Sequence, residues 1–282
     1  MPELPEVQTV VESLNQQALI GKSVTAARVY WPRTIAGLTP AQFRKRIRGC
    51  AILQITRRGK YIVFELSHGL TLLIHLRMTG RLIWTAPSQP RNRHEQVVLE
   101  VHEQNELRFQ DTRKFGRIFL TDAPETILGP LGPEPLAADF TSQRLIGMLQ
   151  AKRGRLKPLL LDQRFLAGLG NIYVDEALWE AHLHPQQLVH RLSEKEIQVL
   201  HQAIVQVLQT GVLNRGTSLG AGQGNFHSLD HRPGRNADQL KVFRRTGQAC
   251  PRCNTVIARI IVAQRSTHLC PHCQPQPLCC KA

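Results

Sequence analysis

Four cysteines near the end of the chain have the spacing of a metal site. Cys250 and Cys253 form one C-x2-C pair, Cys270 and Cys273 form a second, and a β-prone insert of sixteen residues separates the pairs. Four thiolates in two such pairs match a tetrahedral Zn²⁺ site of the structural type, which leaves no position open for a reacting water. We therefore predict one structural Zn²⁺ ion, bound by these four cysteines in a C-terminal hairpin.

Other roles for the cysteines and their neighbours fit less well. Two disulfide bonds are the alternative, but adjacent C-x2-C pairs favour zinc and the sequence carries no mark of secretion. His268 and His272 are alternative ligands with poorer spacing. Of the remaining cysteines, we predict Cys50 to be a small core residue on a strand, and Cys279 and Cys280 to lie in an exposed tail.

The opening stretch MPELPEV places prolines and two carboxylates at the start of an amphipathic helix. Apolar residues recur on one face behind it, which predicts a helix over residues 3–20. A proline at the first helical position gives up no hydrogen bond, and Glu3 and Glu6 oppose the positive end of the helix macrodipole. Taken alone, these residues are explained by helix stabilisation, and a chemical role needs evidence from the rest of the chain.

The chain is basic along its whole length. Its 282 residues include 36 Lys and Arg against 21 Asp and Glu, for a formal net charge of +15. Such a surface attracts polyanions, so nucleic acid is the leading partner and an acidic membrane surface the second. No apolar run reaches membrane-spanning length and no leader precedes the first helix, so we expect a soluble, intracellular protein with no membrane partner.

The elements that would position these residues change character along the chain. Eight short β-prone runs between residues 23 and 122 predict an antiparallel sandwich or barrel. The Pro- and Gly-rich stretch LGPLGPEPLAADF marks a boundary near residue 135. Helical patterns follow at 142–152, 156–163, 172–183 and 193–212, and residues 211–234 form a polar stretch with six glycines.

Seven motifs occur in the order of one known family. They are PELPEV, RRGKY, HLRMTGRL, DTRKFGR, LGPEPL, GLGNIYVDEALWEAHLHP and CPRC followed by AQRSTHLCPHC. Together they span residues 2 to about 275 and resemble the formamidopyrimidine-DNA glycosylases, bacterial base-excision enzymes that remove oxidised purines. No single motif carries the resemblance, but the ordered set does.

The resemblance implies an α+β multidomain fold. An N-terminal helix and an antiparallel β-sandwich would be followed by a helical helix–two-turn–helix domain and a C-terminal zinc β-hairpin. The expected domains are a catalytic domain over residues 1–135, a DNA-binding domain over 136–240 and the zinc finger over 241–276, with a tail at 277–282. A lesion-capping loop is expected at about 211–238, inside the second domain.

The resemblance also implies catalytic roles for four residues. Removal of Met1 would leave Pro2 with a free secondary amine, which in the family attacks C1′ of the damaged nucleotide. The resulting iminium carries positive charge without a proton and acts as an electron sink. Glu3 would be the general acid/base that helps to open the deoxyribose ring. Lys60 would contact the lesion's phosphate and assist β-elimination, and Arg265 would grip the flanking phosphates and assist δ-elimination.

A further six residues are implied to contact DNA. A glycosylase must extrude its nucleotide and fill the gap. Met78 and Phe115 resemble the family's apolar wedge, with ordinary packing beneath the sheet as the alternative, and Arg113 would pair with the orphaned base. The remaining predicted contacts are to the DNA backbone, with Asn171 expected at the N-cap of a helix: His94, Arg153 and Asn171.

The implied activity is bifunctional: N-glycosylase on 8-oxoguanine and formamidopyrimidines in duplex DNA, then strand cleavage by β- and δ-elimination. The predicted partner is damaged double-stranded DNA, with no nucleotide cofactor and Zn²⁺ as the one metal, and the protein is expected to be a monomer in the bacterial cytoplasm, at the nucleoid. Two alternatives stay open, an endonuclease VIII-like enzyme for oxidised pyrimidines and a non-catalytic zinc-ribbon damage sensor. RNA binding is a third, which the basic charge allows and the wedge residues do not favour.

Overall fold

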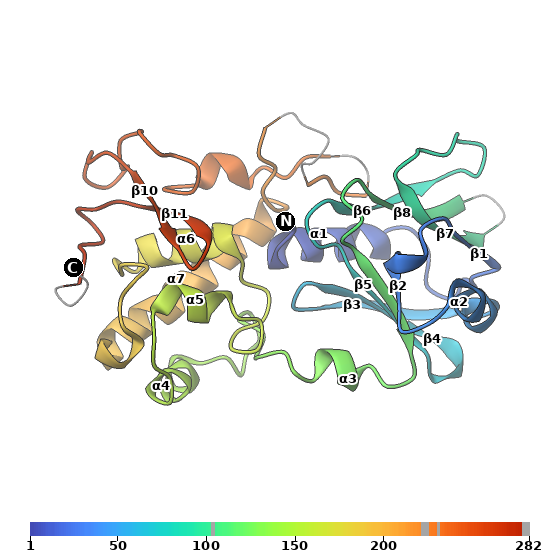
Figure 1. The fold of residues 1–282 in the computed structure, drawn as a ribbon, viewed down its shortest axis with the longest axis horizontal. Helices are drawn as coiled ribbons and strands as arrows, with labels where there is room; N and C mark the ends of the chain where they lie inside the picture. Colours follow the sequence, from blue (N-terminus) through green and yellow to red (C-terminus); the bar gives the residue numbers. More distant parts are fainter. Residues whose placement is uncertain (103–104, 221–225, 230–231, 278–282) are drawn as a thin grey trace. The chain divides into compact units, whose positions relative to one another are not determined.

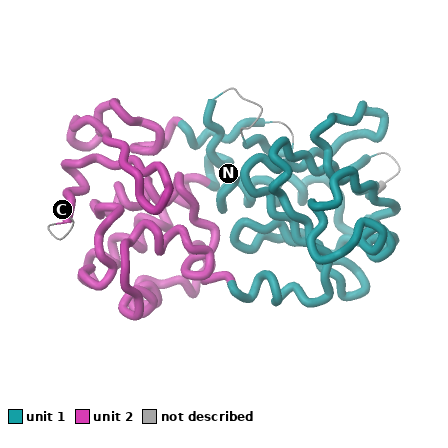
Figure 2. The backbone as a smooth tube through the Cα atoms, in the orientation of Figure 1, with its two compact units in different colours: residues 1–130, 212–237 teal, residues 131–211, 238–282 magenta. Residues whose placement is uncertain are grey.

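The computed structural model describes residues 1–102, 105–220, 226–229 and 232–277. The chain divides into two compact units, each built from two segments (Figure 2). The first unit comprises residues 1–130 and 212–237, and the second comprises residues 131–211 and 238–282. The four-part domain division expected from the sequence stays a prediction.

The first unit begins with helix α1 (Leu4–Asn15), which is capped by Glu3 and has Pro5 in its first turn. Its apolar face is buried, and Leu4 and Leu14 are fully covered. The helix ends five residues earlier than predicted, because Gln17 donates its N–H to the carbonyl of Leu14 in a tightened last turn. The backbone then turns, so the apolar pattern that continues past residue 15 belongs to a turn and not to the helix.

Two sheets form most of the first unit (Figure 1). The four-stranded sheet is antiparallel and has the order β1 (Ala26–Val29), β7 (Glu95–His102), β8 (Asn105–Asp111), β6 (Gly80–Thr85). The five-stranded sheet has the order β2 (Ile35–Ala36), β9 (Arg117–Thr121), β5 (Thr71–His75), β4 (Tyr61–Leu66), β3 (Ile52–Arg58). The eight predicted strands are all present. Strand β2 was not predicted, and it pairs parallel with β9.

One apolar core joins the two sheets to α1 and to a second helix, α2 (Pro40–Ile47). Phe43 and Ile47 lie one helical turn apart and provide the buried face of α2, whose other residues are mostly basic or polar. Two apolar residues are too few to give a helical period, so the sequence did not predict this helix. Cys50 is buried in the same core, but it precedes β3 in the connection from α2 and does not lie on a strand.

Short helical turns complete the connections of the first unit. They are η1 (Pro32–Thr34), η2 (Ser67–Gly69) and α3 (Glu125–Leu128), and η4 (Asn236–Gln239) begins at the end of its second segment and continues into the second unit.

The second unit contains the four predicted helices and the predicted hairpin (Figure 1). Its elements are α4 (Ser142–Gln150), α5 (Leu156–Leu161), α6 (Asn171–Glu180), η3 (Val189–Arg191), α7 (Glu194–Leu213), β10 (Ala258–Val262) and β11 (Arg265–Leu269). Residues Ile172 to Trp179 of α6 are all buried. The antiparallel β10–β11 hairpin turns through Ala263 and Gln264, both with positive φ, as two-residue hairpin turns require. None of the helices in the described ranges has the length and apolar character needed to cross a membrane.

Candidate active site and nucleic-acid interface

The start of α1 is a buried polar site. Pro2 is buried, and the residue Glu3 is 2% exposed. Glu6 accepts the Glu3 N–H on Oε2 at 2.8 Å and the Thr217 N–H on Oε1 at 2.7 Å. Both carboxylate oxygens of Glu6 therefore accept hydrogen bonds from backbone N–H groups, so Glu6 is a supporting group next to Pro2 and Glu3.

The second segment of the first unit approaches α1 closely at Gly216. Its φ is +80°, and a Cβ there would lie 2.9 Å from Cγ of Glu6. Only glycine combines that conformation with that approach. Thr217 pairs with Arg235, so residues before and after the glycine-rich part form two adjacent stems. The sequence predicted one loop over residues 211–238. Gly216 and Thr217, at the start of this loop, pack against α1, whereas 221–225 and 230–231 lie outside the described residues.

Lys60 lies in the turn between β3 and β4 and is 5% exposed. The neighbouring strand brings His75 into the same region, since Tyr61 and His75 are paired across β4 and β5. Burial lowers the pKa of His75 to about 3, and the charges of Arg77 and Lys60 act in the same direction. His75 was not among the predicted site residues, because a lone histidine is more often structural; strand pairing brings it beside Lys60.

Two linked turns carry the predicted wedge residues. Met78 follows β5 and Phe115 follows β8, and their side chains are 39% and 48% exposed. The Arg113 guanidinium carbon lies 4.7 Å from the centre of the Phe115 ring. Exposure excludes packing beneath the sheet, the alternative considered for these residues. Insertion into DNA stays a prediction.

Asp111, at the end of β8, ties the two turns together, and sequence reasoning missed it. Its carboxylate accepts the Gly116 N–H at 2.7 Å, the Arg113 N–H at 3.1 Å and the Thr79 hydroxyl. A Cβ on Gly116 would lie 2.3 Å from the Phe109 ring, so this close turn needs glycine. An aspartate two residues before a basic turn is the sequence feature that could have revealed this role.

His94 lies half-buried at the end of the connection between β6 and β7. Its carbonyl accepts the Asp111 N–H at 2.9 Å, which joins this connection to the strand that leads into the wedge turn. Arg113, Phe115 and His94 therefore share one supporting residue in the first unit, through different atoms of Asp111.

Asn171 and Arg265 are brought together in the second unit. The Asn171 side chain donates to the Ser266 carbonyl at 2.8 Å, and Ser266 follows Arg265, which is exposed at the start of β11. The predicted N-cap role of Asn171 is wrong: Gly170 is the N-cap of α6, and Asn171 is the first helical residue. Arg153 is exposed in the connection between α4 and α5.

A buried ion pair holds the strand that begins with Arg265. Lys157 and Asp175 are both 0% exposed, and Nζ lies 2.5 Å from Oδ1. Lys157 also donates to the Thr267 hydroxyl at 2.8 Å, and Asp175 accepts the His268 N–H at 2.9 Å. The sequence did not reveal this network, because its members come from α5, α6 and β11 and the lysine stands in an otherwise apolar helix.

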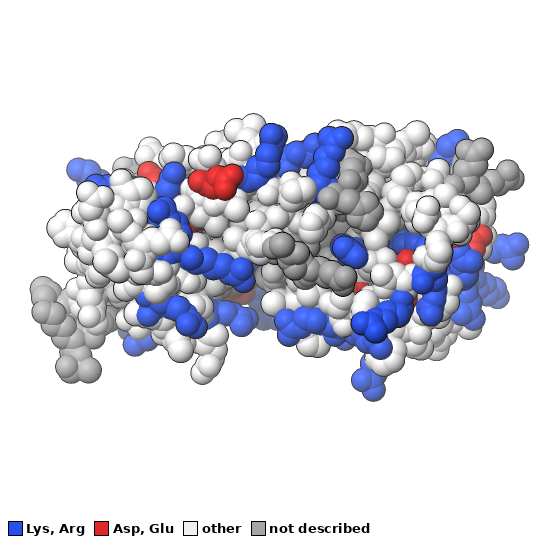
Figure 3. Space-filling model, turned by 90° about the horizontal axis from the view of Figure 1, so that it is seen from above, with Lys and Arg blue, Asp and Glu red and all other residues white. Residues whose placement is uncertain are grey.

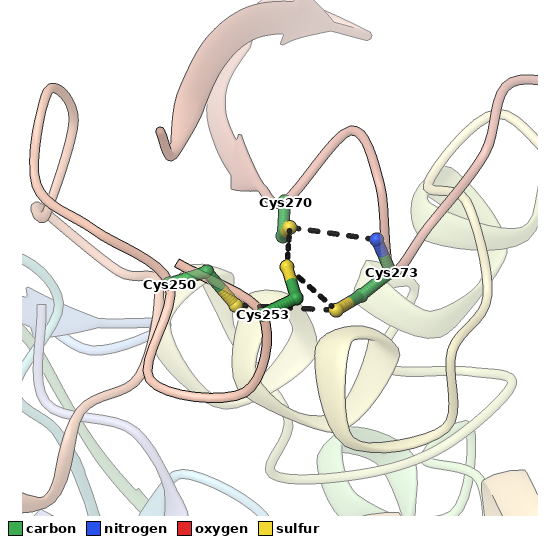
Figure 4. Close-up of side chains that lie close together, drawn as sticks. All are labelled: Cys250, Cys253, Cys270 and Cys273. Atoms are coloured by element: carbon green, nitrogen blue, oxygen red, sulfur yellow. Dashed lines mark hydrogen bonds between the residues drawn. The ribbon is translucent and has the colours of Figure 1, made fainter. Parts of the chain in front are cut away.

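The four cysteines form one compact cluster, as the sequence predicted (Figure 4). Their sulfur atoms all lie within 4.8 Å of one another, and the Cys253–Cys270, Cys253–Cys273 and Cys250–Cys273 distances are 3.4, 3.5 and 3.9 Å. A tetrahedron with Zn–S bonds of about 2.3 Å has edges of about 3.8 Å. The cluster therefore fits one structural Zn²⁺ ion with all four positions taken by sulfur.

Two buried side chains secure the zinc module. Gln274 accepts the Cys270 N–H at 3.0 Å and donates to the Leu183 carbonyl at 2.9 Å. Glu176 of α6 accepts three successive N–H groups at the entry to the module, from residues 241–243, at 2.7 to 3.0 Å. Burial raises the pKa of Glu176. These contacts hold the module to the helices of the second unit.

Basic side chains are spread over the molecular surface, whereas few acidic ones are seen on the face drawn in Figure 3. Three features together define the class of protein: the buried residues at the start of α1, the exposed wedge turns and the closed four-cysteine site. The class is that of zinc-containing proteins built to bind a polyanion and to place reactive groups against it.

Comparisons with known proteins identify the family. The formamidopyrimidine-DNA glycosylase N-terminal domain matches residues 1–118, its H2TH domain matches residues 131–221, and the zinc finger found in FPG and IleRS matches residues 247–276. The chain belongs to the formamidopyrimidine-DNA glycosylase family, and the predicted fold and family are confirmed.

Individual relatives agree over nearly the whole chain. A formamidopyrimidine-DNA glycosylase of Protochlamydia amoebophila is 47% identical over 97% of this chain and 99% of the relative. One of Herpetosiphon aurantiacus is 45% identical over 97% of this chain and 100% of the relative. The structure of Lactococcus lactis Fpg with an abasic site containing DNA has a TM-score of 0.89 at 36% identity, covering 97% of this chain and 100% of that one. Its complex with a N7-benzyl-Fapy-dG containing DNA also has a TM-score of 0.89 at 36% identity, covering 98% and 100%.

Proposed function

We propose that this chain is a bifunctional enzyme of base excision repair. It removes oxidised purines, 8-oxoguanine and formamidopyrimidines, from duplex DNA, and then cleaves the strand as an AP lyase. The relatives named for this activity and the solved complexes of a relative with damaged DNA support the proposal. The observation that carries it is the buried start of α1, where Pro2 and Glu3 stand together with a supporting carboxylate behind them.

The nucleophile is the Pro2 nitrogen, once Met1 has been removed. Its lone pair attacks C1′ of the damaged nucleotide, and the bond from C1′ to the base breaks, so that the base leaves. The departing base takes up a proton, and the ammonium formed at Pro2 loses its N–H proton to solvent. Glu3 then donates a proton to the ring oxygen as the bond from C1′ to that oxygen breaks, and the lone pair of the Pro2 nitrogen forms the iminium with C1′. Glu3 is buried next to Pro2 at the start of α1, so the acid and the nucleophile are held by one element.

Strand cleavage uses the iminium as an electron sink. Loss of the C2′ proton sends electrons toward the nitrogen and expels the 3′-phosphate, and a second elimination expels the 5′-phosphate. Lys60 binds the lesion's phosphate and assists the first step, and Arg265 binds the flanking phosphates and assists the second. Hydrolysis of the remaining imine releases Pro2.

The duplex is opened by side chains on the two linked turns of the first unit. Met78 and Phe115 fill the gap left by the extruded nucleotide, and their exposure on ordered turns supports this role. Arg113 pairs with the base opposite the lesion. Contacts of His94, Arg153 and Asn171 with backbone phosphates add affinity with little sequence preference.

Zinc has a structural role in this scheme. When bound, Zn²⁺ crosslinks the four thiolates and makes the module rigid, without a step in the reaction. Gln274 holds Cys270, and the Lys157–Asp175 pair holds Thr267 and His268, so that the exposed Arg265 side chain starts from a fixed backbone in β11.

The expected domain division, location and oligomeric state belong to the same proposal. We assign catalysis to residues 1–135, DNA binding to 136–240 with the lesion-capping loop at 211–238, and the zinc finger to 241–276. A DNA substrate places the enzyme at the nucleoid in the bacterial cytoplasm, since the named relatives are bacterial. The enzyme acts as a monomer.

The test is trapping with borohydride on an 8-oxoguanine duplex. Protein shown by intact mass to lack Met1 should form a covalent adduct through Pro2 and cleave the strand, whereas protein that retains Met1 should do neither. Absence of an adduct with processed protein would reject the mechanism. Preference for oxidised pyrimidines would identify an endonuclease VIII-like enzyme, and binding without cleavage a damage sensor.

A further inference from the structure

The connection between β6 and β7, residues 86–94, presents basic side chains without the support of a helix or strand. Arg91 and Arg93 are exposed and His94 is half-buried. The Arg91 guanidinium carbon lies 4.2 Å from the centre of the Tyr30 ring, and Arg93 donates to the His94 ring at 3.1 Å. A backbone that lacks a ladder of hydrogen bonds needs other groups to satisfy its carbonyls and hold its course.

Arg108 on β8 is that group. Its side chain is 5% exposed, and its guanidinium points into residues 86–90. It donates to four backbone carbonyls in the segment 86–90: those of Ala86 at 3.3 Å, Pro87 at 3.5 Å, Gln89 at 2.9 Å and Pro90 at 3.5 Å. Five N–H donors in a fixed planar fork make arginine the one side chain able to bind so many acceptors at once.

Two buried carboxylates balance the charge of Arg108. Its Nε lies 2.8 Å from Glu106, and its Nη1 lies 3.3 Å from Glu95. Glu106 pairs also with Arg28, which in turn lies 3.4 Å from Glu100, so the cluster contains two cations and three anions. Glu95 in turn accepts the N–H of Asn92 at 3.1 Å, which fixes the far end of the same connection.

We propose that Arg108 is a positioning residue of the DNA-binding surface. It clamps residues 86–90, directly before Arg91, Arg93 and His94, so that these three side chains are held ready to bind backbone phosphates. Arg108 itself does not touch DNA. The proposal deepens the proposed function, on which it rests for the identity of the ligand, and it adds Arg91 and Arg93 to the phosphate contacts.

The test needs a variant that removes the clamp without leaving buried charge. Arg108→Met alone would leave two buried carboxylates without the cation that balances their charge, which would risk unfolding. We therefore combine Arg108→Met with Glu95→Gln and Glu106→Gln, and call this the neutral-cluster variant. Arg81→Met is the matched control, because Arg81 lies in the same sheet and binds the side chain of Gln110 at 2.7 Å.

The first measurement is limited trypsin digestion of the free protein, which does not depend on DNA. The neutral-cluster variant should be cut after Arg91 and Arg93 at least about tenfold faster than wild type, while its melting temperature stays close to that of Arg81→Met. Arg108→Lys, which keeps the charge but has three donors, should be cut at an intermediate rate. Unchanged cleavage in a folded neutral-cluster variant would overturn the clamp.

The second measurement is the salt dependence of binding to lesion duplex. In the neutral-cluster variant Kd should rise about tenfold near 0.15 M salt, and the slope of log Kd against log salt should fall by about one to two, because phosphate contacts are lost. KM should rise, whereas kcat at saturating DNA should stay within about twofold of the wild-type value. If the neutral-cluster variant has the Kd and the salt slope of wild type, the inference about Arg108 is wrong and the proposed function is unaffected. If the wild-type protein binds lesion duplex but never cleaves it, the proposed function is wrong and the inference about Arg108 is unaffected.

Discussion

Each unit contains a buried ion cluster, and the two clusters do different work. In the second unit, Lys157 and Asp175 are wholly buried and bind β11, a strand that is also held by its hairpin partner and by the cysteine cluster. In the first unit, Arg108 binds a connection with no regular structure of its own. The hairpin has several independent supports, whereas residues 86–90 of the connection are held to the sheet by one guanidinium, and only its far end is held by Glu95 and Asp111.

The difference concerns how a protein can fix a phosphate-binding side chain. A hairpin with a metal site supplies rigidity through many contacts, so losing one contact lowers stability before it alters geometry. A loop segment such as residues 86–90, which a single buried arginine holds to the sheet, loses its geometry first. The following changes test this contrast, from the largest expected effect to the smallest.

Loss of a zinc ligand should have the largest effect. In Cys270→Ser the protein should no longer hold one Zn²⁺ per chain, and β10 and β11 should lose their order, since structural zinc contributes about 10–16 kcal/mol to the folding of such modules. Lesion-duplex affinity should fall by about a hundredfold or more. Metal analysis and binding assays check this, with Cys50→Ser as the control outside the cluster. Retained affinity in a zinc-free protein would show that the metal is dispensable for the hairpin.

Breaking the buried Lys157–Asp175 pair of the second unit should have the second-largest effect. Lys157→Met leaves the Asp175 carboxylate without its cation in the interior, which should lower the free energy of unfolding by about 3–5 kcal/mol. Urea unfolding measures the change, and Lys195→Met on the exposed face of α7 should cost less than about 0.5 kcal/mol. Equal stability of the two variants would mean that the pair adds nothing to the support that the hairpin already has.

The buried histidine of the first unit predicts a pH effect of intermediate size. His75 has a folded-state pKa of about 3, below its ordinary value of 6.5, so the unfolded chain binds the proton more readily. Its contribution to stability is complete above pH 6.5 and is lost as the pH falls from 6.5 toward 3. At pH 5 the loss is about 2 kcal/mol.

The variant His75→Asn isolates this effect. Asparagine can accept the Arg77 N–H, as His75 does at 3.0 Å, but it does not titrate. The difference in unfolding free energy between pH 7.5 and pH 5 should therefore be smaller in the variant than in wild type, as measured by urea unfolding at the two pH values. Identical pH dependence would place the proton on another group.

Removal of Arg265 should have the smallest effect on binding. Arg265→Ala should weaken lesion-duplex binding by about tenfold, lower the salt slope by about one and suppress δ-elimination. Arg265→Lys keeps the charge and should keep the slope. A titration of Kd against salt and a gel assay of the elimination products check this, and an alanine variant with unchanged slope and products would remove Arg265 from the interface.

Much of this architecture could be predicted from the sequence. The eight strands, four helices and the four-cysteine hairpin each have a local pattern: alternation, helical period or C-x2-C spacing. Helix α2 could not be predicted, because two apolar residues do not define a period. The N-cap of α6 was misplaced by one residue, because Gly170 and Asn171 are both acceptable there.

The supporting groups of the site were the least predictable part. The residues predicted to react stand in recognisable motifs, whereas Glu6, Arg108 and Lys157 act through partners on other elements. Lys157 reaches Thr267 over 110 positions of sequence, and Glu6 reaches Thr217 over 211. Only the folded topology brings such pairs together, so a single sequence contains no local trace of them.

The contact between Glu6 and Thr217 has a consequence for synthesis on the ribosome. Thr217 must be synthesised before it can bind Glu6, which lies 211 positions earlier in the chain. Closing so long a loop is entropically costly and slow. Pro2 and Glu3 therefore acquire their finished surroundings only after the segment that contains Thr217 has been synthesised and has reached α1.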